Sequence, residues 1–255
     1  MKLDERMKKY EYITRHYLMC RTPVIVRIDG KAFHTFTKGM KKPFDHIFME
    51  SIQDTMKYLC ENVQGCVLGY CQSDEISLVL LDYETLDTCA WFDNNLNKII
   101  SITSSMASVY FNQQFYLNLL DYKIKNRESK DRDVEYENRL LAKISSLPVF
   151  DSRAFNLSKE EVNNYFVWRQ QDAIKNAIQM IGRAYFTHKE LENKNGKEIV
   201  DMLDSIKVNY HSFSTCEKRG TCCIKTDKGW KLDTEIPIFK DDKDYIEKLI
   251  YIGEG

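Results

Sequence analysis

The sequence predicts an α+β fold, in which helices pack on a small antiparallel sheet. A short apolar, β-branched run at residues 23–26 is typical of a buried central strand. Two further strand-like runs, residues 66–71 and 76–81, are joined by a tight polar link and therefore predict a hairpin. Long segments with apolar residues at helical spacing separate these runs, so helices and strands alternate through the first part of the chain.

Local patterns define the elements expected in residues 1–157. Asp45 and Gly65 are placed to begin and end a helix between the first two strands. The charge-rich segment 123–139 is interpreted as a solvated excursion. Helices are expected over residues 10–20, 45–65 and 94–116, and strands over residues 23–26, 66–71, 76–81 and 148–155.

A second region, residues 158–255, is expected to pack on the first so that the two form one compact unit. A capping-box pattern over residues 158–161 opens a long helix that ends near residue 186. A further helical region, residues 189–204, is interrupted by an Asn-Gly pair. Short strand-like runs follow at residues 222–225, 230–232 and 236–239.

The order strand, helix, strand, strand, helix, strand is the split βαβ arrangement of ferredoxin-like and polymerase-palm folds. In that topology the first and third strands lie side by side and antiparallel at the centre of the sheet. The end of the first strand therefore meets the start of the third. Asp29 and Asp74 occupy these two points, 45 residues apart in sequence (29 to 74) but neighbours in the expected fold.

Composition and charge narrow the classes of function. The 255 residues are 43% hydrophobic and 29% charged, as in ordinary globular proteins. No apolar run approaches the ~20 residues that span a bilayer, and the charged first residues lack a signal core, so we expect a cytoplasmic protein, with an organelle as the alternative. With a net charge of −1, a polyanion would have to bind local basic patches or metal ions. The scattered cysteines favour reduced thiols.

Two carboxylates that meet at strand ends, beside the carbonyl of Gly30, form a site of hard oxygen ligands. Such a site suits Mg²⁺, and two Mg²⁺ ions can clamp the attacking and leaving oxygens of a phosphoryl transfer. The amides of residues 31–34 and the ammonium group of Lys42 would then hold a triphosphate. The alternative is a capped strand and an acidic hairpin tip without a metal.

Two other groups of residues favour structural roles. His211, Cys216, Cys222 and Cys223 are possible zinc ligands, but their spacing fits no standard zinc motif and adjacent cysteines on a strand point to opposite faces. Buried or surface thiols are therefore the preferred interpretation. The aromatic residues of the long helix are expected in the core rather than in a base-stacking platform; these are Tyr165, Phe166 and Trp168.

A set of short motifs resembles those of the tRNA-His guanylyltransferase superfamily, in the right order and over most of the chain. Each motif is weak alone, whereas the combination is specific. The motifs are Arg27-Ile28-Asp29-Gly30 with His34, Lys42-Pro43, Ser73-Asp74-Glu75, Phe150-Asp151-Ser152-Arg153, Trp168-Arg169-Gln170-Gln171-Asp172, Lys218-Arg219-Gly220-Thr221 and Asp233-Thr234-Glu235-Ile236-Pro237.

The resemblance implies a 3′→5′ nucleotide-adding enzyme with a polymerase-like palm, and it implies roles for individual residues. Asp29, Asp74 and the carbonyl of Gly30 would bind two Mg²⁺ ions, with Glu75 beside them as a third catalytic residue. The residues implied in nucleotide binding are Asp29, Gly30, Lys31, Ala32, Phe33, His34, Lys42, Ser73 and Asp74. Contacts with the triphosphate or the RNA are expected from Lys98, Arg153, Arg169 and Asn176.

One departure from the family pattern indicates the subtype. Enzymes dedicated to adding G to tRNA-His carry a His-Ile-Asn-Asn-Leu-Tyr motif after the Arg-Gln-x-Asp pattern, whereas residues 174–179 retain only one of its asparagines, Asn176. A basic pair is also replaced by Asn94 and Asn95. The chain thus resembles most the guanylyltransferase-like proteins, which repair the 5′ ends of truncated tRNAs by template-dependent addition after activation with ATP.

Three other functions stay open at this point. These are G addition to tRNA-His, a palm-type nucleotide cyclase that uses the same carboxylates, and a non-catalytic tRNA-binding module. The presence of both Asp29 and Asp74 argues against a silent module. The resemblance also implies a homotetramer, while the sequence names neither the RNA nor the oligomer.

Overall fold

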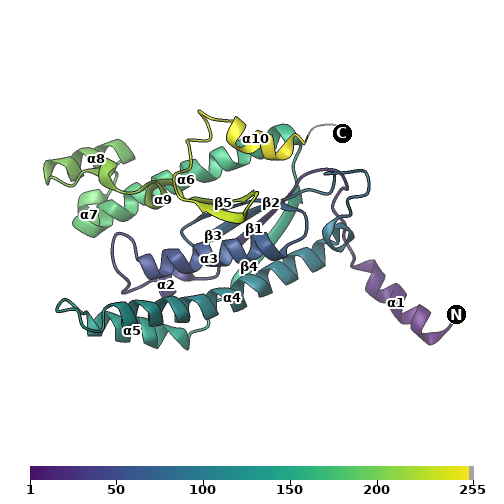
Figure 1. The fold of residues 1–255 in the computed structure, drawn as a ribbon, viewed down its shortest axis with the longest axis horizontal. Helices are drawn as coiled ribbons and strands as arrows, with labels where there is room; N and C mark the ends of the chain where they lie inside the picture. Colours follow the sequence, from purple (N-terminus) through teal and green to yellow (C-terminus); the bar gives the residue numbers. More distant parts are fainter. Residues whose placement is uncertain (253–255) are drawn as a thin grey trace.

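A six-stranded antiparallel sheet forms the centre of the protein (Figure 1). The computed structural model describes residues 1–252. The sheet has the order β4-β1-β3-β2-β5-β6. The strands are β1 (Val24–Gly30), β2 (Cys66–Gln72), β3 (Glu75–Leu80), β4 (Phe150–Asn156), β5 (Thr221–Thr226) and β6 (Gly229–Asp233). The predicted adjacency of the first and third strands is confirmed, since β1 pairs with β3 from Val24–Leu80 to Asp29–Glu75.

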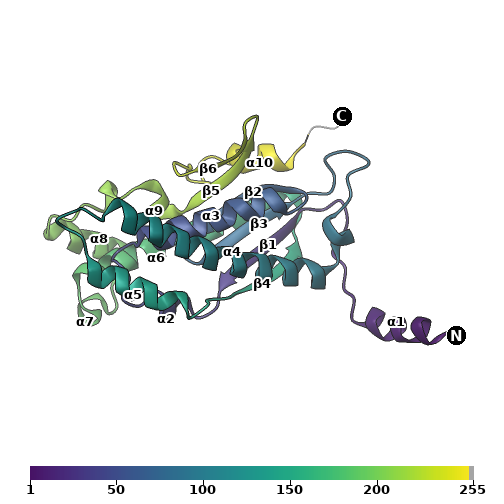
Figure 2. The same cartoon turned by 60° about the horizontal axis from the view of Figure 1, so that its bottom comes forward.

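Helices cover both faces of the sheet (Figures 1 and 2). Alternate residues of β1 divide between two cores, because successive side chains of a strand point to opposite faces. Val26 and Ile28 join the core under α3 (His46–Asn62) and α4 (Leu96–Lys125), whereas Ile25 joins the core under α6 (Lys159–Tyr185) and α10 (Asp244–Ile250). The other helices are α1 (Leu3–Ile13), α2 (Phe33–Phe36), α5 (Val134–Ile144), α7 (His188–Leu191), α8 (Gly196–Ser205) and α9 (Thr215–Arg219), with 3₁₀ helices Trp91–Asn94 and Tyr210–Ser212.

The N-terminal helix differs from the prediction of a helix over residues 10–20. Residues 16–18 are held extended because Leu18 N–H donates to the Asn94 carbonyl and the His16 carbonyl accepts from Leu96 N–H. The helix α1 therefore ends at Ile13, and it projects from the body with none of its residues buried (Figure 1). Along the 252 described residues, no helix combines the length and apolarity that crossing a bilayer requires.

The charge-rich insert is packed, which corrects its interpretation as a solvated excursion. Helix α4 continues to Lys125, and residues 134–144 form α5 beside it. Tyr136 and Leu140, four residues apart on α5, are buried in the main core, and Arg132 pairs with the buried Glu137. The sequence did not predict this packing, because Tyr136 and Leu140 are only two apolar residues among many charged ones and give a weak helical period.

The C-terminal strand predictions are confirmed for two of three runs. Residues 222–225 lie in β5 and 230–232 lie in β6, which extend the same sheet. Residues 236–239 are not a strand. Instead the Gln170 side chain of α6 donates to the Pro237 carbonyl at 2.8 Å and accepts from Phe239 N–H at 3.0 Å, replacing a neighbouring strand.

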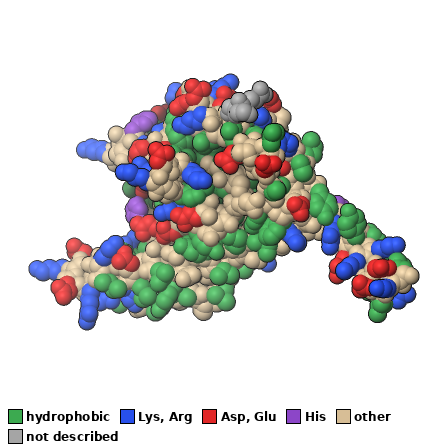
Figure 3. Space-filling view, turned by 45° about the vertical axis from the view of Figure 1, so that its right-hand side comes forward, with side chains coloured by type: hydrophobic (Ala, Val, Ile, Leu, Met, Phe, Trp, Pro, Cys, Tyr) green, Lys and Arg blue, Asp and Glu red, His purple; other side chains and the backbone are tan. Residues whose placement is uncertain are grey.

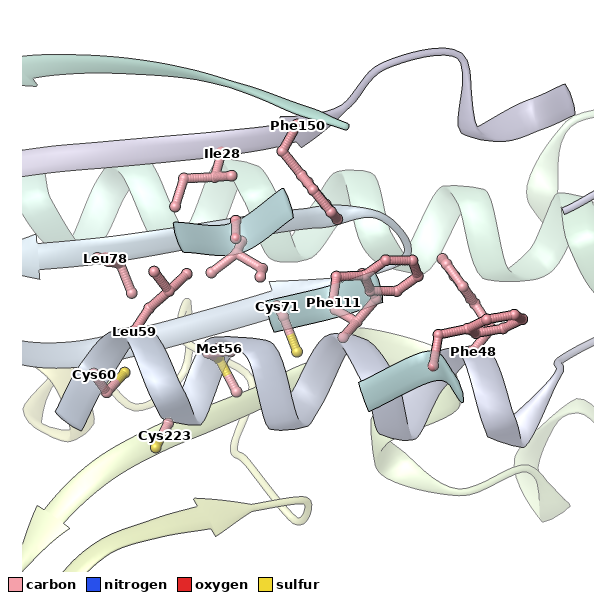
Figure 4. Close-up of a cluster of buried hydrophobic side chains, with 14 of the residues drawn as sticks. Ile28, Phe48, Met56, Leu59, Cys60, Cys71, Leu78, Phe111, Phe150 and Cys223 are labelled. Carbon is pink, nitrogen blue, oxygen red and sulfur yellow. The ribbon is translucent and has the colours of Figure 1, made fainter. Parts of the chain in front are cut away.

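An aromatic cluster fixes the chain where β1 ends (Figure 4). The buried Phe33 ring lies 4.9 Å from the Phe150 ring, 5.4 Å from Phe111 and 6.0 Å from Phe48, measured between centroids. It also packs so closely on Gly30 that a Cβ there would lie 2.3 Å from Cδ2 of Phe33. Gly30 therefore permits the turn that places Asp29 at the edge of the core.

The buried carboxylate of Asp45 joins three elements. It accepts from Phe48 N–H as the N-cap of α3, from Lys41 N–H at 2.9 Å and from the Tyr136 hydroxyl at 2.7 Å. We predict that Asp45→Ala lowers the free energy of unfolding by about 2–4 kcal/mol, because the cap is lost and buried donors are left unpaired. Tyr136→Phe should cost about 0.5–1.5 kcal/mol.

Urea unfolding followed by circular dichroism measures both values. Asp133→Ala is the matched control, since the exposed Asp133 caps α5 through Tyr136 N–H, and a loss of about 1 kcal/mol is expected. A cost for Asp45→Ala no larger than that of the control would contradict a linking role for Asp45.

Candidate active site

The two predicted carboxylates come together where β1 ends and β3 begins. Asp29 lies opposite Glu75 in the register of the two strands, and Gly30 N–H donates to the Asp74 carbonyl at 3.1 Å. Ser73 takes a positive φ of 51° in the tight turn before β3, and its hydroxyl donates to the Asp74 carboxylate. The structure thus places Asp29, Gly30 and Asp74 side by side.

Burial and neighbouring charges shift the pKa values of Asp74 and Glu75. Partial burial raises the pKa of Asp74, and the nearby Asp29 carboxylate raises it further against the hydrogen bond from Ser73. Burial likewise raises the pKa of Glu75, while the guanidinium of Arg169 opposes that shift. The site therefore concentrates negative charge that its surroundings solvate poorly.

Glu75 is engaged on both of its carboxylate oxygens. Arg169 donates to them at 2.7 and 2.8 Å, and Arg169 also donates to Asp172 at 3.0 Å. Arg27 lies 3.8 Å from Glu75 and 3.8 Å from Asp29, and its buried Nε has no hydrogen-bond partner within the described chain. Glu75, predicted as catalytic, is therefore placed to position its neighbours.

A cavity of about 610 Å³ opens beside Asp74. It lies between the strand ends, the segment from α2 to Phe48, and the second half of α6. Of the residues predicted in nucleotide binding or RNA contact, it gathers Gly30, Ala32, Phe33, His34, Lys42, Ser73, Asp74 and Asn176. The predictions missed Thr37, Met40, Lys41, Pro43, Asp45, Phe48, Gln179, Met180 and Arg183.

The missed residues on α6 carried a signal in the sequence. Gln179, Met180 and Arg183 follow Asn176 by three, four and seven residues, so all four share one helical face. In the sequence, Arg169, Asp172, Asn176 and Arg183 recur at spacings of three, four and seven residues, which indicates one polar side of this helix. What the spacing did not show is that this side faces the strand ends.

Three predicted contacts lie elsewhere. Lys98 stands at the start of α4 with its ammonium 5.4 Å from the Phe92 ring. The adjoining Asn94 side chain donates to Asp82, beyond the far end of β3 from Asp74, so Lys98 does not reach the cavity. Arg153 is half-exposed on β4 and pairs with Asp151 at 3.2 Å, and Arg169 is buried against Glu75.

The backbone around α2 matches its predicted role only in part. Lys31 N–H donates to the Val149 carbonyl at 2.9 Å, so this amide is not free to hold a phosphate. Within the described residues, no acceptor is present for the amides of Ala32, Phe33 and His34. These three amides are the ones that remain available to a ligand.

The predictions for the cysteines and for the aromatic residues of the long helix have different outcomes. Cys222 and Cys223 are buried in different cores on the two faces of β5, and residues 1–252 hold no group of three or more His, Cys, Asp or Glu side chains arranged for a metal. Tyr165 and Phe166 are buried as predicted. Trp168 is 53% exposed, so its assignment to the core is wrong.

Sequence comparisons agree with this geometry. The family model described as tRNAHis guanylyltransferase matches residues 4–158. A tRNA(His) guanylyltransferase of Debaryomyces hansenii is 24% identical over 235 residues, covering 85% of this chain and 80% of the relative. A probable tRNA(His) guanylyltransferase of Dictyostelium discoideum is 27% identical over 237 residues, covering 85% and 82%.

Solved structures extend the similarity to nearly the whole chain. A bacterial tRNA(His) guanylyltransferase-like protein in complex with ATP superposes with a TM-score of 0.84 and 42% identity, covering 98% of this chain and 100% of the other. One in complex with GTP gives a TM-score of 0.76 and 38% identity with the same coverage. The matched segment includes the strand ends that carry Asp29 and Asp74, and this chain belongs to the tRNAHis guanylyltransferase family.

Proposed function

We propose that this nucleotidyltransferase adds nucleotides in the 3′→5′ direction to the 5′ end of truncated tRNA, directed by the opposite strand of the acceptor stem. The observation that carries the proposal is the cavity itself, which joins the strand-end residues Gly30 and Asp74 to the cations Lys42 and Arg183. Carboxylates beside cations suit phosphoryl transfer from a triphosphate. A palm-type identity for β1 to β4 forms part of the proposal.

The strand-end residues fit a magnesium site. The donors are two carboxylates and the backbone carbonyl of Gly30, which are the oxygen ligands that Mg²⁺ prefers. The close approach of Asp29 and Asp74, which contributes to the raised pKa of Asp74, is unfavourable without a cation. We propose that Asp29, Gly30 and Asp74 hold two ions, which when bound neutralise the phosphate oxygens of the reacting groups.

The chain's own residues would bind and orient the two substrates. Lys42 and Arg183 supply positive charge to a triphosphate, and the free amides of Ala32, Phe33 and His34 supply further donors. In the activation step the 5′-phosphate oxygen attacks the α-phosphorus of ATP and pyrophosphate leaves. In the transfer step the 3′-hydroxyl of an incoming NTP attacks the activated 5′ phosphate and AMP leaves.

Template-directed repair is preferred over dedicated G addition because of α6. At residues 174–179 the helix retains only Asn176 of the motif that marks dedicated enzymes, and Asn176 lines the cavity. The 42% identity with a guanylyltransferase-like protein in complex with ATP supports the same choice. When base pairing selects the nucleotide, the protein need not read the base.

A homotetramer and a cytoplasmic location stay predictions. An apolar surface on α4 supports an interface between copies. Figure 3 shows hydrophobic side chains gathered along the lower edge of the molecule, where α4 and α5 lie. The exposed apolar residues of α4 are Ile102, Val109, Tyr116, Leu117 and Ile124.

The proposed activity is tested with labelled NTPs, ATP and Mg²⁺ on two RNAs. One is a tRNA that lacks its first 5′ nucleotide, and the other is tRNA-His without its extra G. We expect only the complementary nucleotide to extend the truncated tRNA. Asp29→Ala and Asp74→Ala should lower this rate by about 10³-fold or more, because each removes an ion ligand.

Asp87→Asn is the acidic control, since Asp87 is exposed in a loop, and it should extend the RNA at the wild-type rate. Efficient G addition to tRNA-His instead would indicate the dedicated enzyme. Release of a cyclic nucleotide would indicate a cyclase, and no reaction by the wild-type protein would leave only a binding module.

A separate prediction concerns Arg183, one of the cavity cations to which the sequence assigned no nucleotide contact. Arg183→Ala should raise the KM for ATP by about 10-fold or more, the usual effect of losing a hydrogen bond to a charged group, and Arg183→Lys should recover part of the loss. Steady-state kinetics with varied ATP measure this. Lys189→Ala, on the exposed start of α7, is the control, and equal KM values for the two alanine variants would exclude a triphosphate contact at Arg183.

A further prediction follows from the raised pKa of Asp74. Because the folded protein binds this proton more tightly than the unfolded chain, stability contributed by the protonated form is lost as pH rises through the shifted pKa. Asp74→Asn should therefore raise the Tm at pH 7.5 by about 1–3 °C without Mg²⁺. The difference should vanish below the ordinary pKa of an aspartate.

Calorimetric scans with and without Mg²⁺ check the same variant. Mg²⁺ should raise the Tm of the wild-type protein through binding to the folded state, and it should not raise that of Asp74→Asn. Asp87→Asn should follow the wild-type protein in every condition. A lower Tm for Asp74→Asn at pH 7.5 would show that the carboxylate stabilises the free protein.

A further inference from the structure

Trp168 presents a large aromatic surface to solvent. Its side chain is 53% exposed although it lies on α6 among buried neighbours. The guanidinium carbon of Arg169 lies 4.4 Å from the indole centroid, and the Tyr165 ring lies 6.0 Å away at 70°. Tyr165 is itself fixed by a 2.7 Å hydrogen bond with Ser77. The indole is therefore held in place rather than free to turn away from solvent.

The support of this indole is shared with the candidate active site. Arg169 is clamped by Glu75 and Asp172, and Arg27 bridges from Glu75 to Asp29. Each link in this series is an ion pair between partly or fully buried groups. Together with the cation–π contact between Trp168 and Arg169, these ion pairs connect the exposed indole to the Asp29 carboxylate.

Trp168 lies on the β4 side of the sheet. Tyr165, which contacts Trp168, also packs against Phe155 of β4 at 5.9 Å. Phe155 alternates along β4 with Arg153 and Asp151, so all three side chains share the face that α6 covers. Asp151 pairs with Asp29 in the sheet, which puts the half-exposed Arg153 and the Asp29 carboxylate on this same face.

The nucleotide cavity uses a different part of α6. On α6 its lining begins at Asn176 and continues to Arg183, whereas Trp168 stands eight residues before Asn176, about 12 Å along the helix. Asp74 lines the cavity, whereas the Asp29 carboxylate lies on the sheet face that carries Arg153 and that Tyr165, the neighbour of Trp168, covers. We call this second region the Trp168–Arg153 surface. These two surfaces differ in character, one concave with cations and the other open with an exposed aromatic ring.

We propose that Trp168 is the platform on which the terminal base of the RNA stacks while its 5′ phosphate receives the nucleotide. The inference rests on the proposed function. In-line displacement places the attacking 3′-hydroxyl of the NTP opposite the leaving AMP, and the 5′ oxygen of the RNA stays bonded to the same phosphorus between them. With an NTP in the cavity, the RNA end must therefore reach the strand-end carboxylates from outside the cavity. Arg153 is placed to pair with a backbone phosphate near that base.

Stacking on an indole also suits a templated reaction. Every base has a π-face, so an aromatic platform accepts any terminal pair without reading its sequence. The neighbouring Arg169 already donates three hydrogen bonds to Glu75 and Asp172, so stacking on the indole is the main contact that this surface offers to a base. The platform would hold the 5′ end of the RNA at a fixed distance from Asp29 and Asp74.

The test uses the full chain and a 5′-monophosphorylated tRNA that lacks its first nucleotide and carries 2-aminopurine as its new 5′-terminal base. Binding of this RNA to the wild-type protein should quench the 2-aminopurine fluorescence. Trp168→Ala should abolish the quenching and weaken RNA binding by about 5- to 150-fold. It should raise the KM for RNA without changing the affinity for ATP measured in the absence of RNA.

Two variants separate stacking from a structural effect. Trp168→Phe should restore most of the affinity and quenching, because phenylalanine keeps an aromatic face. Tyr185→Ala is the control on the same helix, since Tyr185 is 48% exposed, and it should bind the RNA as the wild-type protein does. An equal loss of ATP affinity in Trp168→Ala would show a structural role and overturn the proposal.

The outcomes distinguish the platform from the function on which it rests. A wild-type protein that extends the truncated tRNA, with unchanged RNA affinity and quenching in Trp168→Ala, overturns the platform alone. A change only in sedimentation of Trp168→Ala would assign the indole to a contact between copies and overturn it as well. A wild-type protein that extends no RNA overturns the proposed function itself.

Discussion

The ion pair between Glu75 and Arg169 is the interaction on which the rest of the site depends. Both side chains are less than 10% exposed, at 8% and 7%, and the pair joins α6 to the sheet beside the strand ends. Burying two charges is costly, and only good geometry with further partners offsets that cost. Here the bidentate contact, Arg27 and Asp172 supply those partners. Removal of either partner would strand a buried charge, so the four side chains act as a unit.

This ion pair joins the middle of α6 to the start of β3. Residues before it bury Tyr165 and Phe166 against the sheet and leave Trp168 at the surface. Residues after it turn Asn176 and Arg183 into the cavity beside Asp74. Two surfaces with different chemistry therefore follow from one helix and one anchoring contact. A shift of the anchor would displace both.

Sequence patterns predicted the part of the site that depends on strand topology. The alternation of short apolar runs and helices was enough to place Asp29 next to Asp74, because neighbouring strands have only a few possible orders. The same patterns did not predict the role of Arg183 or the exposure of Trp168. Helical spacing defines which residues share a face, but tertiary packing decides where that face points.

Two other differences have the same kind of cause. Tyr136 and Leu140 anchor α5 to the core. Because they are only two apolar residues among many charged ones, the helical period of hydrophobic residues is too weak to predict that this helix is packed. Residues 236–239 have strand-like composition, and the side chain of Gln170 satisfies their backbone from a helix 69 residues away. Neither contact is local, so neither leaves a local signature.

Asp29, Asp74 and Glu75 show why residue type alone does not assign a role. All three are acidic and lie at the same pair of strand ends. Glu75 meets two arginines, which neutralise it and fix its position. Asp74 receives one hydrogen bond from another side chain, the Ser73 hydroxyl, and burial together with the nearby Asp29 charge raises its pKa. The carboxylate with the fewest protein partners is the one best suited to a cation, while the fully paired one keeps the neighbouring groups in place.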